Sequence, residues 1–209
     1  MAGIVAVVSL LASDLLGSDR LAGIGSAAFT TGAALTMVPL AAIMRRRGRR
    51  PGLLGALLIG AVGAAIAATG GELRWFPLFV VGMLLFGAGQ AATLQQRYVA
   101  ADLADDSQAA TAIAAIVWVG TLGAAFGPTL APVEKAVARG LGLDELVGPF
   151  LFATLFFALA AGVVFVRLRP DPLAVVGGSD PDAERVRPLV QVRRSASVIR
   201  SSPNAVLGL

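Results

Sequence analysis

Long apolar segments separated by short polar clusters dominate the sequence, and this pattern predicts membrane-spanning helices. Residues 21–43 and 52–69 contain no Asp, Glu, Lys or Arg at all. A helix rises about 1.5 Å per residue, so about 20 apolar residues cross the roughly 30 Å hydrocarbon core of a bilayer. We therefore expect these two segments to form consecutive spans.

Four more apolar segments extend the pattern to six spans, at residues 1–16, 76–99, 109–130 and 149–166. The first is short, at roughly 24 Å, and no positive residue precedes it as in a signal peptide, so we interpret it as a short or truncated span. Residues 133–146 are amphipathic and too charged to cross. Six spans place both chain ends on the same side of the membrane.

The composition changes after the last of these segments. Residues 168–203 are rich in Pro, Asp, Arg and Ser, which predicts a solvated, basic cytoplasmic connector without a core of its own. Residues 204–209 turn apolar again and are interpreted as the start of a further apolar segment. The prediction is an all-α membrane protein with a six-span bundle at 1–167, followed by the connector and that short apolar start.

Five arginines between the second and third predicted spans set the orientation of the chain. We call Arg45, Arg46, Arg47, Arg49 and Arg50 the arginine cluster. Lys and Arg concentrate on the cytoplasmic side of membrane proteins. Counted up to Arg169, the side with the cluster carries eight Lys and Arg and the other side carries four. We expect a multi-pass protein of the cytoplasmic (inner) membrane with both termini in the cytoplasm.

The cluster also has a second interpretation, because Arg-rich runs form nuclear localisation signals and nucleic-acid patches. Apolar spans flank it on both sides, and the net charge of +4 is placed around spans rather than along a polar fold. The spans favour binding to anionic lipid headgroups, at about 1 kcal/mol per basic residue. The bilayer is therefore an expected partner, and nucleic acid is not.

Composition narrows the function classes further. A chain with 56% hydrophobic and 14% charged residues is typical of a polytopic membrane protein. It contains no Cys and no His, so it lacks thiol chemistry, the commonest metal ligand and the commonest general base. No G-x-x-x-x-G-K-[ST] run for ATP occurs. We expect no enzyme activity, no metal site and no cofactor.

The arginine cluster carries a resemblance to a known family. The stretch PLAAIMRRRGRRPGLL resembles the cytoplasmic loop motif G-x-x-x-D-R-x-G-R-R of the major facilitator superfamily. The matching positions are Arg46, Gly48, Arg49 and Arg50. Ala41 replaces the first glycine of the motif, and Arg45 replaces its aspartate. In the family, that aspartate is thought to help lock the two halves of the transporter on the cytoplasmic side.

Two later stretches add to the resemblance. GAAFGPTLAP resembles the family's antiporter motif in span five, through Gly123, Gly127 and Pro128. A group of actinobacterial members has an LQxRY-xxxDLA signature, which is matched by Gln95, Arg97, Tyr98, Asp102 and Leu103. Residues 1 to about 170 thus resemble the N-terminal six-span half of such a transporter, which is built of two inverted three-helix repeats.

The resemblance implies a function. It implies secondary active transport of a small organic solute or drug-like compound by alternating access, coupled to protons. The partner would be a second six-span half, from the same chain or from a homodimer. The alternative is a non-transporting six-span membrane protein, a transporter remnant that binds or regulates a partner. This alternative is motivated by the end of the sequence at Leu209 and by the altered loop motif.

Polar groups in membrane spans are functional candidates by default. Asp14 is a candidate for a protonatable carboxylate in the substrate path, unless it only ends the first span in water. Gln90 and Thr93 share a helix face and are candidates for substrate hydrogen bonds in the cavity. Their alternative role is to hold helices together, at about 0.6 kcal/mol per hydrogen bond.

The remaining candidates are Trp118, Thr121, a charged pair and the span-five motif. Trp118 and Thr121 are cavity candidates, although Trp118 also fits a lipid-facing or core position. Arg97 and Asp102 are gate candidates, unless Arg97 snorkels to the interface and Asp102 caps backbone groups. The glycines and proline of span five would bend the helix or let it pack closely against a neighbour.

Overall fold

The computed structural model describes residues 2–16, 23–104 and 108–168 of the chain. All of them lie in one compact unit, Met1–Gly178, and a second unit, Ser179–Leu209, lies outside the described residues. The connector and the short apolar segment expected after residue 168 therefore also lie outside them. Within the described residues, helices follow one another in the order α1 (Ala2–Leu16), α2 (Gly23–Arg47), α3 (Arg49–Glu72), α4 (Phe76–Leu103), α5 (Ala109–Phe126), η2 (Gly127–Leu130), α6 (Ala131–Gly140), η3 (Glu145–Val147) and α7 (Gly148–Arg167).

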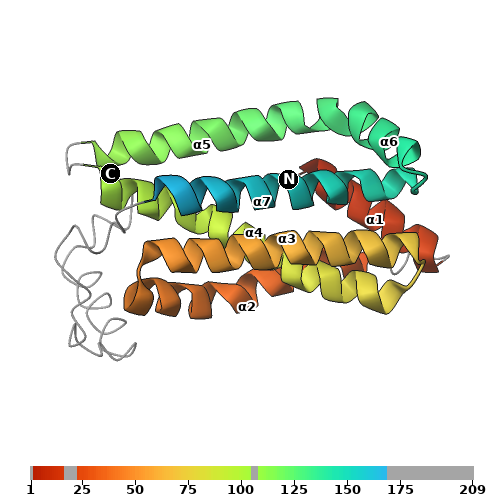
Figure 1. Ribbon diagram of the computed structural model, residues 1–209, viewed down its shortest axis with the longest axis horizontal. Helices are drawn as coiled ribbons and strands as arrows, with labels where there is room; N and C mark the ends of the chain where they lie inside the picture. Colours follow the sequence, from red (N-terminus) through yellow and green to blue (C-terminus); the bar gives the residue numbers. More distant parts are fainter. Residues whose placement is uncertain (1, 17–22, 105–107, 169–209) are drawn as a thin grey trace, which may run out of the picture. The chain divides into compact units, whose positions relative to one another are not determined.

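The all-α membrane fold expected from the sequence is confirmed. Five helical stretches of the described chain are long and apolar enough to cross a membrane, and α1, with 15 residues, is the short first span. The long helices lie lengthwise alongside one another (Figure 1). The amphipathic stretch between the last two predicted spans forms α6 and η3.

The link between α2 and α3 is shorter than residues 44–51, which separate the two predicted spans. Helix α2 continues to Arg47 and α3 already begins at Arg49, so the arginine cluster lies in the last and first turns of these helices. Only Gly48 breaks the helical backbone, with φ 102° and ψ 164°, a conformation that glycine adopts without steric cost. Arginine side chains reach outward from a helix end, so a polar loop is unnecessary.

Small residues hold α3 and α4 together along an antiparallel line of contact. A Cβ atom added to Gly63 would overlap the backbone of α4 at Phe86, and one added to Gly60 would overlap Gly89. Glycine at such positions lets two backbones approach closely, which is how helices associate in membranes. The residues that face each other in register are Gly60 and Gly89, Gly63 and Phe86, Ala67 and Gly82, and Gly70 and Phe79.

Phenylalanines fill the core that these helices enclose. Phe86 of α4 is buried, and its ring lies 5.1 Å from that of Phe29, 6.5 Å from that of Phe150 and 5.5 Å from that of Phe157. The rings are tilted or edge-on, the arrangements that aromatic pairs prefer. Helices α2, α4 and α7 therefore meet at one residue.

Helix α5 is the least packed of the long helices. None of the residues in its apolar stretch is buried, whereas half or more of the corresponding stretches of α3 and α4 are. The exposed fractions reach 68% at Trp118 and 64% at Phe126. Helix α5 therefore presents a large apolar surface that the described part of the chain does not cover.

Candidate functional site

The polar residues of α4 lie on its inner side near the middle of the helix. Gln90 is close to the centre of Phe76–Leu103, and its side-chain Oε1 is buried with no hydrogen-bond donor among the described residues. Thr93 donates a hydrogen bond to the carbonyl of Gly89, at 3.0 Å. A buried acceptor without a donor costs about 1–3 kcal/mol, so Gln90 is the more informative of the two.

The candidates on α5 lie apart from the core. Trp118 and Thr121 are exposed, so Trp118 does not occupy a core position in the described bundle. The Thr121 hydroxyl donates to the Val117 carbonyl at 2.9 Å. A Cβ on Gly123 or Gly127 would meet nothing within 4 Å, so neither glycine makes a close helix contact among the described residues. The helix does change to a 3-10 turn at Gly127.

The loop-motif residues meet the end of α7. Arg50 donates a hydrogen bond to the Phe165 carbonyl at 2.9 Å, and its guanidinium carbon lies 4.8 Å from the centre of the Phe165 ring. A cation near the last carbonyls of a helix is favourable because the helix dipole is negative there. Arg46 is exposed and Arg49 is half-buried, and Gly48 is buried between the helix ends.

The candidate gate pair is only partly described. Arg97 is half-buried near the end of α4, and its Nε atom is buried without a hydrogen-bond acceptor among the described residues. Asp102 belongs to the last turn of α4, but its side chain lies outside the described residues. The gate role of the two residues stays a prediction.

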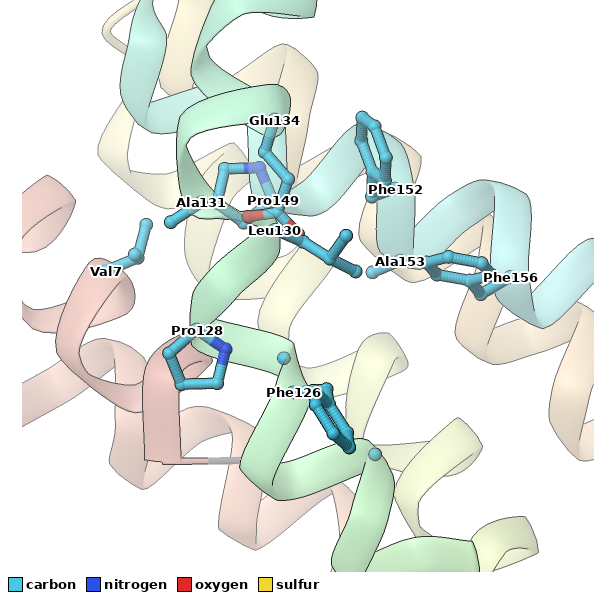
Figure 2. Close-up of a pocket in the computed structure, with 12 residues that line it drawn as sticks. Val7, Phe126, Pro128, Leu130, Ala131, Glu134, Pro149, Phe152, Ala153 and Phe156 are labelled. Atoms are coloured by element: carbon cyan, nitrogen blue, oxygen red, sulfur yellow. The ribbon is translucent and has the colours of Figure 1, made fainter.

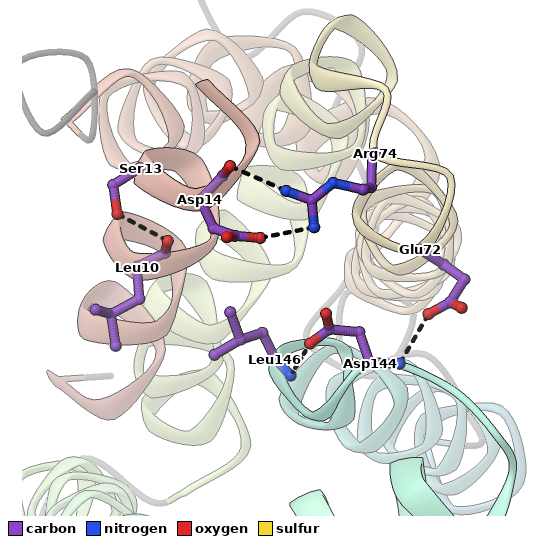
Figure 3. A network of polar contacts seen from close by, with 7 residues as sticks. All are labelled: Leu10, Ser13, Asp14, Glu72, Arg74, Asp144 and Leu146. Carbon is purple, nitrogen blue, oxygen red and sulfur yellow. Dashed lines mark hydrogen bonds and ion pairs between the residues drawn. The ribbon is translucent and has the colours of Figure 1, made fainter. Parts of the chain in front are cut away.

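Asp14 forms a polar network at the other end of the bundle (Figure 3). Its Oδ2 atom lies 3.0 Å from Nη1 of Arg74, and Nη2 of Arg74 donates to the backbone carbonyl of Asp14 at 3.1 Å. Glu72 accepts a hydrogen bond from the backbone N–H of Asp144 at 2.9 Å. Asp144 in turn caps η3 by accepting from the N–H of Leu146. The network links the ends of α1 and α3 to the start of η3.

The sequence left Asp14 as either a protonatable carboxylate or the end of a span in water, and it did not indicate Arg74 as a partner. The partners are 60 residues apart in sequence, so no local pattern announces them. Arg74 is also the one described non-glycine residue with a positive φ, 51°. A residue in this left-handed conformation costs roughly 1–2 kcal/mol unless it is glycine.

Substitutions of Arg74 can therefore separate the cost of its left-handed backbone from the contribution of its ion pair with Asp14. Replacing it by Ala or by Gly removes the ion pair in both cases, but only Gly relieves the left-handed backbone. The pair itself contributes less than about 1 kcal/mol, since the side chains are 58% and 46% exposed. We expect Arg74→Gly to be more stable than Arg74→Ala by about 1 kcal/mol, measured by thermal unfolding in detergent. Equal stabilities would contradict strain at this position.

No group of three or more Asp and Glu residues within the described ranges is placed to hold a metal ion. The candidate site thus consists of hydrogen-bonding and charged side chains on spans and span ends. The fold places Arg50 against the end of α7 and Asp14 against the turn between α3 and α4. Gln90 and Thr93 lie on α4, whereas Trp118 and Thr121 lie on α5.

Comparisons with known proteins point to one family. The model of the Major Facilitator Superfamily matches residues 1–208. Two Bacillus subtilis relatives, the uncharacterised MFS-type transporters YddS and YdeG, are 40% and 39% identical over 171 residues, which is 82% of this chain. The riboflavin transporter RfnT of Brucella anthropi is 28% identical over 203 residues, or 95% of this chain. The chain spans 39%, 40% and 48% of the lengths of these relatives. No solved structure matches it.

Proposed function

The chain belongs to the major facilitator superfamily and is a multi-pass membrane protein, and from this premise we propose that it forms half of a solute pathway. The protein moves a small organic solute or drug-like compound across the cytoplasmic membrane by alternating access. Its six helices rock as one body against a second six-span half. Both ends of the six-span bundle are on the cytoplasmic side, as the arginine cluster implies.

The observation that carries this proposal is the buried, unpartnered Oε1 of Gln90. A polar group without a partner in the middle of a membrane span is costly and marks a pathway rather than a packing contact. A substrate donor would satisfy it when the two halves enclose the solute. Thr93, Trp118 and Thr121 complete the proposed lining, and Arg97 with Asp102 forms the proposed cytoplasmic gate.

Proton coupling is the finer part of the proposal. Asp14 is the proposed proton carrier, and Arg74 is the cation that it exchanges for a proton as the pathway opens. Support comes from their 3.0 Å ion pair at the end of the bundle opposite the arginine cluster, where it is accessible from solution. The pair is exposed enough to break and re-form during a transport cycle.

The test is flux into proteoliposomes that contain the purified protein, with and without a pH gradient. Riboflavin, named for one relative, is the first compound of a broad panel of organic solutes. Gln90→Leu should lower the rate about tenfold, the equivalent of one lost hydrogen bond. Asp14→Asn should abolish the effect of the gradient.

The matched control for the span polar groups is a second threonine. Thr154→Val on α7 removes a hydroxyl bonded to its own helix, as Thr93→Val does on α4. Only the α4 variant should slow the flux. If the wild-type protein moves no compound of the panel down any gradient, the transport proposal fails.

A further inference from the structure

A pocket lies where the chain turns from α5 into α6 (Figure 2). Helix α5 ends at Phe126, the 3-10 turn η2 carries Pro128, and α6 begins at Ala131. Pro128 has no N–H to donate, so the α-helix changes course there. Between this corner, α7 and Val7 of α1 lies a cavity of about 410 Å³. Pockets for small molecules have volumes of this order.

The wall of the pocket is apolar except for one carboxylate. Glu134 is the one charged residue among those that line it, and Figure 2 shows its carboxylate pointing into the space next to Leu130. The other lining residues are Val7, Gly123, Phe126, Gly127, Pro128, Leu130, Ala131, Pro149, Phe152, Ala153 and Phe156. Three aromatic rings thus share the pocket with a single negative group.

The backbone holds Glu134 in place against α7. A Cβ atom on Gly148 would overlap the Glu134 carbonyl, so α6 and the start of α7 are in direct backbone contact. Pro149 and Phe152, which follow Gly148 on α7, line the pocket together with Glu134. A carboxylate on a rigid element, rather than on a loop, is the arrangement that precise binding requires.

The neighbouring cations do not neutralise Glu134. Arg139, on the same helix, pairs instead with Glu145, at 3.3 Å. Arg74 pairs with Asp14 at the end of α1. Lys135 is exposed and does not line the pocket, and Ala138 occupies the position one turn after Glu134 where an i, i+4 partner would lie. The described residues therefore leave the carboxylate without an ion-pair partner.

We propose that this pocket binds an amphiphilic amine, a molecule with one ammonium group on an apolar body. The ammonium pairs with the Glu134 carboxylate in an apolar surrounding, where a charge-assisted hydrogen bond is strong. The body packs against the aromatic rings, whose faces also attract cations. Phe126 and Phe156 are 64% and 52% exposed on the flank of the bundle, so the ligand enters from the bilayer.

The argument for this site does not depend on the proposed solute pathway. Helix α5 contributes to both, but none of the residues proposed to line the pathway, Gln90, Thr93, Trp118 and Thr121, lines the pocket. No sequence pattern indicates this pocket, because Glu134 falls in an amphipathic stretch where a carboxylate is expected at the surface. Binding is measured at equilibrium, so a protein that transports nothing still allows the test.

The test compares three probes of equal length on the purified protein in phosphatidylcholine nanodiscs. These are dodecylamine, dodecanol and dodecanoate in radiolabelled form, with empty nanodiscs to correct for partitioning. We expect dodecylamine to bind at least about tenfold more tightly than dodecanol, and dodecanoate to bind weakest. Equal affinities for the three probes would overturn the proposal.

Two variants separate charge from shape. Glu134→Gln keeps the volume and should weaken dodecylamine about tenfold while leaving dodecanol unchanged. Ala153→Phe fills the pocket and should weaken both probes. Glu145→Gln is the matched control, since it removes a carboxylate at the same end of the bundle but outside the pocket. If Glu145→Gln weakens dodecylamine as much as Glu134→Gln does, the site assignment is wrong.

Phosphatidylethanolamine carries the same chemistry, an ammonium on an apolar body. Repeating the measurement in nanodiscs that contain this lipid distinguishes the two sources of ligand. If phosphatidylethanolamine weakens dodecylamine binding to the wild-type protein but not to Glu134→Gln, the lipid is an occupant of the site. Unchanged dodecylamine binding identifies a free amine as the ligand. If phosphatidylethanolamine weakens dodecylamine binding equally in the wild-type protein and in Glu134→Gln, the role of the carboxylate is contradicted.

Discussion

Gly63→Leu should prevent the six-helix bundle from folding into a stable, monodisperse protein. The new side chain would start inside the backbone of α4 at Phe86, where the two helix backbones are in direct contact. Overpacking of a core position costs typically about 1–3 kcal/mol. Here the new side chain clashes with backbone atoms, which cannot move aside by changing a rotamer as a side chain can. We expect a destabilisation of about 3 kcal/mol or more, seen as loss of the symmetric size-exclusion peak and a lower melting temperature.

The control for this prediction is Gly55→Leu on the same helix. A Cβ on Gly55 meets nothing within 4 Å, so the added side chain points into open space. Both variants make the same change in helix propensity and hydrophobicity. If the two proteins elute and melt alike, the close approach of α3 and α4 is wrong.

Replacing Arg46, Arg49 and Arg50 together by Glu should randomise the orientation of the protein in the membrane. Counted up to Arg169, the change leaves five Lys and Arg on the side of the cluster, eight less three, against four on the other side. The positive-inside bias is then almost lost, since acidic residues contribute little to it. We expect the fraction of molecules with the normal orientation to fall to about half.

The orientation can be measured by labelling a single introduced cysteine, because the sequence contains no other. A single Cys in place of Leu73, which is 64% exposed in the turn opposite the cluster, reports the orientation. A membrane-impermeant maleimide should label it fully in intact cells that carry the wild-type cluster. Changing the same three arginines to Lys preserves the charge and should preserve the labelling. Full labelling of the Glu variant would contradict the predicted orientation.

The helical spans could be predicted because the bilayer leaves the backbone few options. Without water, every N–H and C=O group must be bonded within the chain, so a charge-free stretch such as residues 52–69 has to be helical. The ends of the helices were harder to predict. The arginine cluster lies between the two predicted spans, but arginine side chains are long enough to reach water while the backbone stays helical on both sides of Gly48.

The contacts between helices could be predicted less well than the helices themselves. The glycines of span five and those of α3 have similar spacing in the sequence. A Cβ on Gly60, Gly63 or Gly70 of α3 would overlap the backbone of α4, whereas one on Gly120, Gly123 or Gly127 would meet nothing within 4 Å. The difference arises from which helices meet, and spacing alone does not contain that information. For the same reason, Arg74 was missed as the partner of Asp14, and Glu134 was missed as a pocket residue.

The single-residue link at Gly48 has a consequence for motion. Because no loop separates α2 from α3, a tilt of one helix must displace the first turn of the other. Arg50 lies in that turn and contacts Phe165, a residue 115 positions later at the end of α7. The ends of α2, α3 and α7 at this end of the bundle are therefore coupled, and a tilt of α2 would displace the end of α7 as well.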